Sequence, residues 1–169
     1  QIFLDGNCGT MEWTVVRPCH IYGPGSLLGC LPTHGRDKDL IDRMRKEEPL
    51  KLVGGGHFLQ QPILASDLAD LMLSLADCES AADRIFQAAG PDIVESKAFY
   101  EIIADLLGVG LQVEEIPVGE YLRDHPAAAP FLCHRIYDLS RLEAVGAAVP
   151  ATPLVRGLAA HVESMLDKG

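Results

Sequence analysis

The sequence has little positive charge and no long apolar run. Its 169 residues include 14 Lys and Arg against 24 Asp and Glu, which gives a net charge of −10 at pH 7. Because binding to a phosphate backbone depends on clustered cations, this composition argues against nucleic acid as a ligand, although a local basic pocket for one phosphorylated ligand remains open. The apolar stretch 62–76 is interrupted by Asp67 and Asp70, so it does not qualify as a membrane span.

Cysteine is scarce and irregularly spaced, with five residues at positions 8, 19, 30, 78 and 133. An odd number of well-separated cysteines favours reduced thiols, and no basic segment followed by an apolar one marks a secretory signal. The sequence therefore predicts a cytoplasmic protein. Cys30 and His34 form an isolated pair without zinc-finger spacing. The scattered positions of the Cys and His residues predict core thiols rather than a metal site. Cys19 and His20 are adjacent and point to opposite sides of an extended segment, so this pair is not a Cys–His dyad, whereas a dyad of Cys19 with a distant His stays open.

The most informative segment is residues 13–25, which read WTVVRPCHIYGPG. Trp, Thr and two Val favour a strand, and the absence of alternation at Val15 and Val16 indicates a strand covered on both faces of a parallel sheet. Pro18 ends this strand, and an irregular segment with a Gly-Pro-Gly turn follows. Because ligands bind at the carboxyl ends of parallel strands, we expect a site here.

The remaining chain alternates helical and strand patterns, which predicts an α/β fold. Residues 1–11 are expected to form a helix end and a loop. Strands are expected at 50–53, 84–89 and 111–116, and helices at 37–48, after Ser66 or Asp67, at 97–107 and at 153–166, while 117–130 is helical or loop. Polar residues at the starts of the helices predict N-caps at Asp37, at Ser66 or Asp67, at Ser96, and at Asp138 or Ser140.

Three blocks of the sequence carry a family resemblance. Arg17-Pro18 followed by Tyr22-Gly23-Pro24-Gly25 resembles the segment after the catalytic helix in extended short-chain dehydrogenases/reductases, the nucleotide-sugar epimerase/dehydratase group. Residues 57–69 resemble that family's Arg-Asp-Phe-Val-x-Val-x-Asp-Leu-Ala block, and residues 135–153 resemble its closing block. The resemblance spans about residues 13–165. It implies the C-terminal portion of a Rossmann-type parallel sheet plus a small α+β substrate-binding lobe.

Two motifs of that family are missing from the chain. There is no G-x-G-x-x-G before a helix, and Tyr22, Tyr100, Tyr121 and Tyr137 have no Lys four residues on. In the family that the chain resembles, both motifs lie upstream of the segment with which this chain begins. The chain also starts at Gln1 without Met. We therefore expect residues 1–169 to be a single fragment of a longer chain, without catalytic residues and inactive alone. The resemblance implies that the parent binds NAD or NADP.

The resemblance also implies which residues contact ligands. The backbone of Pro18, Cys19, His20 and Ile21 would meet the nicotinamide end of the cofactor, and His20, Tyr22, Gln60 and Arg135 would face the substrate. His20 either faces the substrate or only fills the loop.

Gln60 stands where the family has an Arg that binds the substrate diphosphate, whereas Arg135 is retained. A neutral or smaller substrate (a sugar, a polyol, an aldehyde or a hydroxy acid) therefore remains open beside a nucleotide sugar.

Two function classes follow. The first is the substrate-binding part of an NAD(P)-dependent sugar or nucleotide-sugar epimerase, dehydratase or reductase. The second is a non-catalytic member of the superfamily that acts as an RNA- or protein-binding module, with the acidic charge weighing against RNA. In either case an isolated chain would leave Val15, Val16, Ile85 and Phe86 without sheet neighbours, which predicts a homodimer or exchanged elements.

Overall fold

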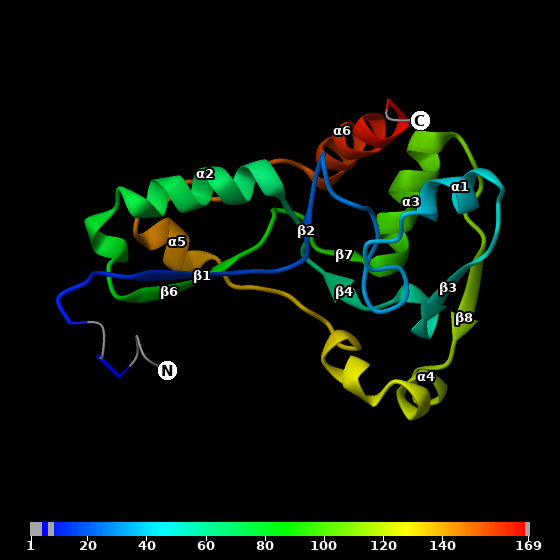
Figure 1. Ribbon diagram of the computed structural model, residues 1–169, viewed down its shortest axis with the longest axis horizontal. Coiled ribbons are helices and arrows are strands. Elements are labelled where there is room, and N and C mark those ends of the chain that lie inside the picture. The colour runs from blue at the N-terminus through cyan, green and yellow to red at the C-terminus, as the bar shows by residue number, and fades with distance from the viewer. Residues whose placement is uncertain (1–4, 7–8, 168–169) are drawn as a thin grey trace.

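The computed structural model describes residues 5–6 and 9–167 (Figure 1). Residues 1–4, for which a helix end is expected, and Cys8 lie outside the described residues. The chain builds two regions. The strand region contains β1, β6, α2 and α5, and the lobe contains α1, β3, α3, β8, α4 and α6. The α/β prediction is confirmed.

The strand region is a parallel strand pair packed against two helices. β1 (Thr14–Pro18) pairs with β6 (Arg84–Ala88) from Thr14 opposite Arg84 to Pro18 opposite Ala88. α2 (Ala65–Ala76) and α5 (Ser140–Ala144) accompany this pair, and their buried side chains form one core with Phe86.

Two expectations concern the burial of this strand pair. The expectation that β1 is covered on both faces is wrong, and the expectation that the isolated chain leaves both strands uncovered is wrong in part. Val15 and Val16 are half-buried rather than covered on both faces, because β1 has a single strand neighbour within the described residues. Phe86 was expected to lack cover in the isolated chain, yet it is only 1% exposed because it belongs to the core with Leu71 and Leu142.

The lobe is built on a second parallel pair, β3 (Leu50–Val53) with β8 (Val113–Ile116). The helices α1 (Leu40–Arg45), α3 (Ser96–Leu107) and α6 (Leu154–Leu166) contribute to the core beside it, and α4 (Val118–Asp124) lies at the edge. The core includes the side chains that the helical spacing predicts, among them Leu40, Met44, Phe99, Ile103 and Leu158.

Short strands connect the two regions. β2 (Ile21–Tyr22) pairs in parallel with β5 (Ile63–Leu64), and β4 (Leu59–Gln60) pairs antiparallel with β7 (Val94–Glu95). Three short 3₁₀ segments complete the fold: Gly54–Gly56, Glu79–Ala81 and Pro126–Phe131. The sequence predicted an irregular segment after Pro18 and missed β2. A strand of two residues is too short to show the alternation of apolar and polar side chains by which strands are predicted.

Most of the predicted N-caps are wrong. α2 begins after Leu64, and Asp67 instead accepts hydrogen bonds from the backbone of Ala151 and Thr152. Ser96 is the first residue of α3, and its hydroxyl is bonded to the Phe58 carbonyl at 3.3 Å. Polar side chains near a helix start can thus serve tertiary contacts rather than the helix itself.

The ends of the other helices are closer to expectation. Asp37 accepts a bond from the Asp39 backbone at 3.0 Å, but α1 begins only at Leu40. Asp138 accepts the Ser140 N–H at 2.9 Å beside the start of α5, but the N-cap of this helix is Leu139 rather than Asp138 or Ser140. Gly108 ends α3 with a left-handed φ of 68°, a conformation that favours glycine. Within the described residues, no helix combines the length and the apolar character needed to cross a bilayer.

Candidate functional site

The site is formed where the chain passes from the strand region into the lobe. The Cys19 N–H donates to the Ala88 carbonyl at 3.0 Å, which carries the β1–β6 pairing one residue past Pro18. The Ile63 N–H then donates to the His20 carbonyl at 2.9 Å, where β2 begins to pair with β5. The backbone from Pro18 to Ile21 is therefore fixed at the carboxyl end of a parallel strand pair, the place where α/β sheets bind ligands.

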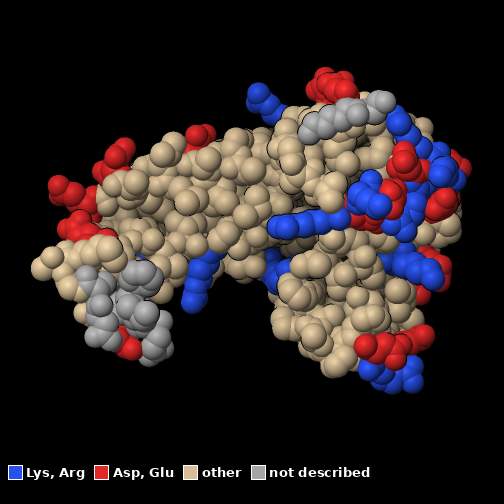
Figure 2. Space-filling view, in the orientation of Figure 1, with Lys and Arg blue, Asp and Glu red and all other residues tan. Residues whose placement is uncertain are grey.

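A cleft of about 900 Å³ opens at this point. Its walls come from the segment 18–21, from residues 23–27, from the loop 29–36 and from the segment 131–137, so both regions contribute. Figure 2 shows the face hollowed between the elongated strand region and the part of the lobe that carries α4. A cleft of this size suits a ligand as large as a nucleotide or a sugar derivative.

Five of the predicted ligand contacts line this cleft, namely Pro18, Cys19, His20, Ile21 and Arg135. The two others, Tyr22 and Gln60, do not, and each is only 2% exposed. Tyr22 packs in the lobe core against Phe99 and His161. The structure therefore places Tyr22 and Gln60 behind the wall of the cleft rather than on its surface.

Gln60 orients the His20 side chain. Its Oε1 lies 3.2 Å from His20 Nδ1, and its Nε2 donates to Cys30 Sγ at 3.0 Å. Because the amide oxygen is an acceptor, this pairing places a proton on His20 Nδ1. Burial, assisted by the charge of Arg135, lowers the pKa of His20 to about 4, so the imidazole is neutral at pH 7. The ring also packs on Phe99, with the ring centres 5.5 Å apart.

The thiols at the cleft are held in the protonated form. Burial raises the pKa of Cys19 to about 11 and that of Cys30 to about 12. Cys19 Sγ donates to the Gln61 carbonyl at 2.7 Å, which also favours the thiol. Since the thiolate is the nucleophile and the metal ligand, neither sulfur is activated for attack. Across residues 5–6 and 9–167, no group of three His, Cys, Asp or Glu side chains is arranged to hold a metal ion.

Positive charge faces the cleft, and the described residues that line it include no carboxylate to compensate that charge. The lining residues include Arg36 and Arg135 and contain no Asp or Glu, in a chain whose net charge is −10. In the described part of the chain neither arginine forms an ion pair, and Arg135 Nε is buried without a hydrogen-bond partner. The Arg135 guanidinium lies 5.8 Å from the centre of the Phe131 ring. Such a cation gains most from an anionic ligand, because burial of an unpaired charge is costly.

Among the cleft residues that sequence reasoning missed, Ser26, Arg36, Phe131 and Tyr137 carry polar or aromatic side chains. Tyr137 is held by its backbone N–H, which donates to Gln61 Oε1 at 2.9 Å, while Gln61 Nε2 donates to the Gly90 carbonyl at 2.8 Å. Burial raises the pKa of the Tyr137 hydroxyl, so it remains a neutral hydrogen-bonding group. Only the fold brings these residues together. Tyr137 alone could have been predicted, because it lies two residues after the predicted contact Arg135.

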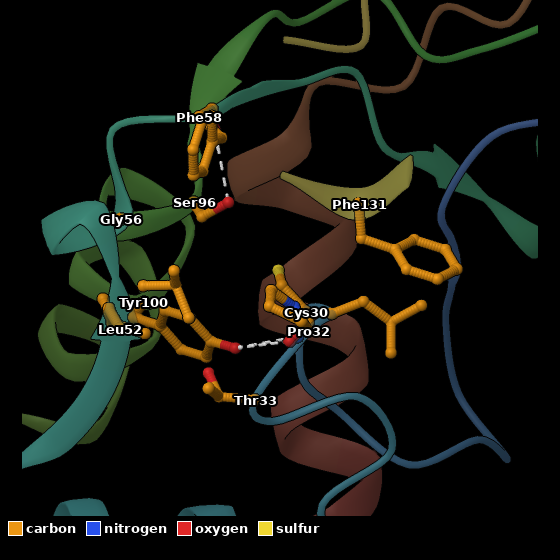
Figure 3. A pocket seen from close by; sticks show the side chains of 11 residues that line it. Cys30, Pro32, Thr33, Leu52, Gly56, Phe58, Ser96, Tyr100 and Phe131 are labelled. Atoms are coloured by element: carbon orange, nitrogen blue, oxygen red, sulfur yellow. Dashed lines mark hydrogen bonds between the residues drawn. The ribbon is translucent and has the colours of Figure 1, made fainter. Parts of the chain in front are cut away.

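A second, much smaller pocket lies behind the cleft, between the loop 30–33, β3 and α3 (Figure 3). Its volume of about 10 Å³ is that of a single water site. The Tyr100 hydroxyl points at the Cys30 backbone, where it accepts from the N–H at 2.8 Å and lies 3.3 Å from the carbonyl. This contact anchors the loop 29–36 to α3. Leu31 and Phe131 line both the small pocket and the cleft, whereas Cys30 lines only the small pocket and supports the cleft wall from behind.

No protein-family model matches the sequence, and no curated protein matches it either. Solved structures do match. UDP-glucose 4-epimerase with UDP-glucose from Thermotoga maritima is 16% identical with a TM-score of 0.76, over 99% of this chain and 50% of that one. UDP-N-acetylglucosamine 4-epimerase from Methanobrevibacter ruminantium, in complex with UDP-N-acetylmuramic acid, is 14% identical with a TM-score of 0.76, over 99% and 51%. RMD from Pseudomonas aeruginosa, complexed with NADPH, is 16% identical with a TM-score of 0.72, over 99% and 52%.

These similarities establish the fold. The chain has the architecture of the C-terminal part of nucleotide-sugar epimerases and related NAD(P)-dependent proteins, which confirms at the level of the fold the resemblance read from residues 13–165. It spans about half the length of the structures it matches. At identities of 14–16% the shared fold does not by itself assign an activity, so function has to be argued from the cleft.

Proposed function

We propose that this chain is the substrate-binding C-terminal part of an NAD(P)-dependent enzyme that acts on a nucleotide sugar or another anionic sugar derivative. The observation that carries the proposal is Arg135, which has no ion-pair partner within residues 5–6 and 9–167 and lies in a cleft of about 900 Å³ whose described lining residues include no carboxylate. The carboxyl ends of β1 and β6 are where such a sheet binds a ligand. Structures of the same fold hold NADPH or UDP-glucose.

The proposal includes a division of labour within a longer protein. The backbone of Pro18, Cys19, His20 and Ile21 would meet the nicotinamide end of NAD or NADP, and Arg135 and Arg36 would bind the anionic part of the substrate. His20, neutral and held by Gln60, would present a ring to the sugar. The chain lacks a Tyr-x-x-x-Lys motif, so the part upstream of Gln1 would supply the acid/base residue and the chain alone would be inactive.

The test is calorimetric titration of the full-length protein with NAD(H), NADP(H) and UDP-glucose, with the 169-residue chain as the control. We expect binding of one cofactor by the full-length protein and none by the control. Arg135→Gln should weaken UDP-glucose by about tenfold to hundredfold, the usual size of a lost charge-assisted contact. Arg84→Gln, an exposed arginine at the opposite end of β6, removes the same charge and should leave the affinity unchanged. Equal effects of both substitutions would contradict the proposal.

A homodimer and a cytoplasmic location are further parts of the proposal. Between the start of β1 and α2, a groove of about 360 Å³ is lined by Trp13, Val16, Met72 and Leu75 among others. Met72 is 53% exposed there, and β1 has a single strand neighbour among the described residues, so exposed apolar side chains and a strand edge favour association. Light scattering on the isolated chain should give the mass of a dimer, and the mass of a monomer would contradict it.

A further inference from the structure

The last helix of the chain touches the wall of the cleft through one buried side chain. We call residues 23–26 the cleft loop, since all four line the cleft. The loop closes on itself, because the Ser26 N–H donates to the Gly23 carbonyl at 3.2 Å and Ser26 Oγ donates to the same carbonyl at 2.8 Å. Its outer surface, from Pro24 to Ser26, is exposed, whereas Gly23 is buried.

His161 on α6 joins both ends of this loop and is fully buried, with 0% exposure. The Gly23 N–H donates to His161 Nδ1 at 3.1 Å, so this nitrogen acts as an acceptor. His161 Nε2 lies 2.9 Å from the Ser26 carbonyl, which can only accept, so this nitrogen carries the proton. One neutral tautomer, with the proton on Nε2, therefore satisfies both contacts, and an imidazolium would lose the bond from Gly23.

The geometry around His161 leaves the helix little freedom to move away. One turn earlier on α6, a Cβ added at Gly157 would clash with the hydroxyl and ring of Tyr22, so the Tyr22 side chain packs directly against the helix backbone. The Tyr22 ring also stacks on His161, with the ring centres 6.5 Å apart. At the start of α6, the Leu154 N–H donates to Asp92 Oδ2 at 2.6 Å, which ties the helix to the loop after β6.

We infer that His161 is a positioning residue: its neutral imidazole bridges Gly23 and Ser26 and holds the cleft loop in its ligand-ready conformation. The role of His161 in ligand binding rests on the proposed function, because it requires that the cleft binds the substrate. The role of His161 in holding the cleft loop is independent of the proposed function. A histidine far from the cleft in sequence thus controls the shape of one of its walls, and only a side chain with an acceptor at the δ position and a donor at the ε position fits both partners.

Three variants of the full-length protein test this inference. His161→Phe keeps a ring and removes both hydrogen bonds. His161→Asn restores an acceptor at the δ position for the Gly23 N–H. Val162→Ala is the control, because Val162 is buried on the same helix at 3% exposure and belongs to the lobe core. All three should lower stability, so stability alone does not separate the roles.

Two readouts separate positioning from a general loss of packing. The first is the rate of hydrogen exchange at the Gly23 amide. Compared with the unmodified protein, this rate should be about tenfold or more higher in His161→Phe and unchanged in Val162→Ala. In His161→Asn it should be lower than in His161→Phe. The second is the affinity for UDP-glucose, which should follow the same order. In the unmodified protein, nitrogen NMR should show His161 protonated at Nε2 only.

The outcomes also separate this inference from the proposed function. If UDP-glucose binds and His161→Phe weakens it no more than Val162→Ala does, the positioning role is wrong and the proposed function stands. If UDP-glucose does not bind at all, the exchange rate at Gly23 and the tautomer of His161 still decide whether the clamp exists. A proton found on Nδ1, or Gly23 exchange equally fast in His161→Phe and Val162→Ala, would overturn the inference.

Discussion

The strand region and the lobe differ in how completely they bury their apolar side chains. In the lobe, Leu40, Phe99 and Tyr100 are fully buried at 0% exposure. In the strand region, α2 leaves Met72 53% and Leu73 67% exposed. β1 also pairs on one edge only, as far as the described residues extend. The lobe has the larger buried core, although Val155 on α6 is 56% exposed. The strand region has the smaller core, and the adjacent exposed side chains on α2 form a surface of the kind that another part of a protein covers. The cleft lies between the two, so its geometry depends on both.

The sharpest test of this difference is a matched pair of core truncations. Phe99→Ala in the lobe should lower the free energy of unfolding by about 3–5 kcal/mol, because Tyr22, His20 and Tyr100 surround the ring and limit relaxation. Phe86→Ala in the strand region should cost less, since the open side of the strand pair can adjust around the cavity.

Urea unfolding would measure both losses. The single tryptophan, Trp13, reports the strand region by fluorescence, and circular dichroism reports the whole chain. Equal losses for the two variants would mean that the strand region is as tightly packed as the lobe, and the comparison would fail.

A second pair of substitutions probes the contact between α6 and the connecting strands. Gly157→Ala places a methyl group 2.3 Å from the Tyr22 hydroxyl and should destabilise the protein by about 1–3 kcal/mol. Gly119→Ala is the control, because a Cβ at this α4 position meets nothing within 4 Å. It should stabilise the protein slightly, by roughly 0.5–1 kcal/mol, through its effect on the unfolded chain. Thermal unfolding would detect both changes, and a neutral Gly157→Ala would show that the contact is loose.

A further effect should appear in the pH dependence of stability, because His20 lies where the two regions meet. Its pKa falls from an ordinary 6.5 to about 4 in the folded protein, mainly through burial. The unfolded chain therefore binds a proton first as the pH falls, so stability is fully present above pH 6.5 and declines between pH 6.5 and 4. His20→Gln should flatten this part of the curve. An unchanged slope in urea titrations across that range would contradict a buried, neutral His20.

The sequence predicted the regular elements well and their junctions poorly. The apolar faces of α3 and α6 follow from helical spacing, although Leu106 on α3 is 39% exposed. The strand pairs β2–β5 and β4–β7 were not predicted, because two residues carry no periodicity. The caps at Ser66 or Asp67 and at Ser96 were wrong because Asp67 and Ser96 serve contacts with distant backbone groups.

The site was predictable only where it is local in sequence. Residues 18–21 follow a recognisable strand, and the structure places all four at the cleft. Tyr22 was misplaced because side chains alternate along β2, which turns Tyr22 into the core while Ile21 faces the cleft. Arg36 and Phe131 come from segments far apart in the sequence, and no local pattern links them. The sequence suggested that Gln60 replaces an arginine that binds phosphate in the family. In the structure, Gln60 is buried and its amide oxygen orients the His20 ring.

The last expected effect is a difference in chemical labelling between the half-buried Cys19 and the buried Cys30 on one side and the exposed Cys133 on the other. Cys133 is exposed, so limiting iodoacetamide at pH 8 should modify it before Cys19 or Cys30, as peptide mass spectrometry would show. With a pKa of about 11, Cys19 is a thiolate in only about one molecule in a thousand at that pH. The raised pKa also means that the unfolded thiol, with its ordinary value of 9.0, ionises first, so Cys19 lowers stability as the pH rises from 9 to 11. Early labelling of Cys19 would instead reveal an opened cleft, in which the strand region and the lobe separate in solution.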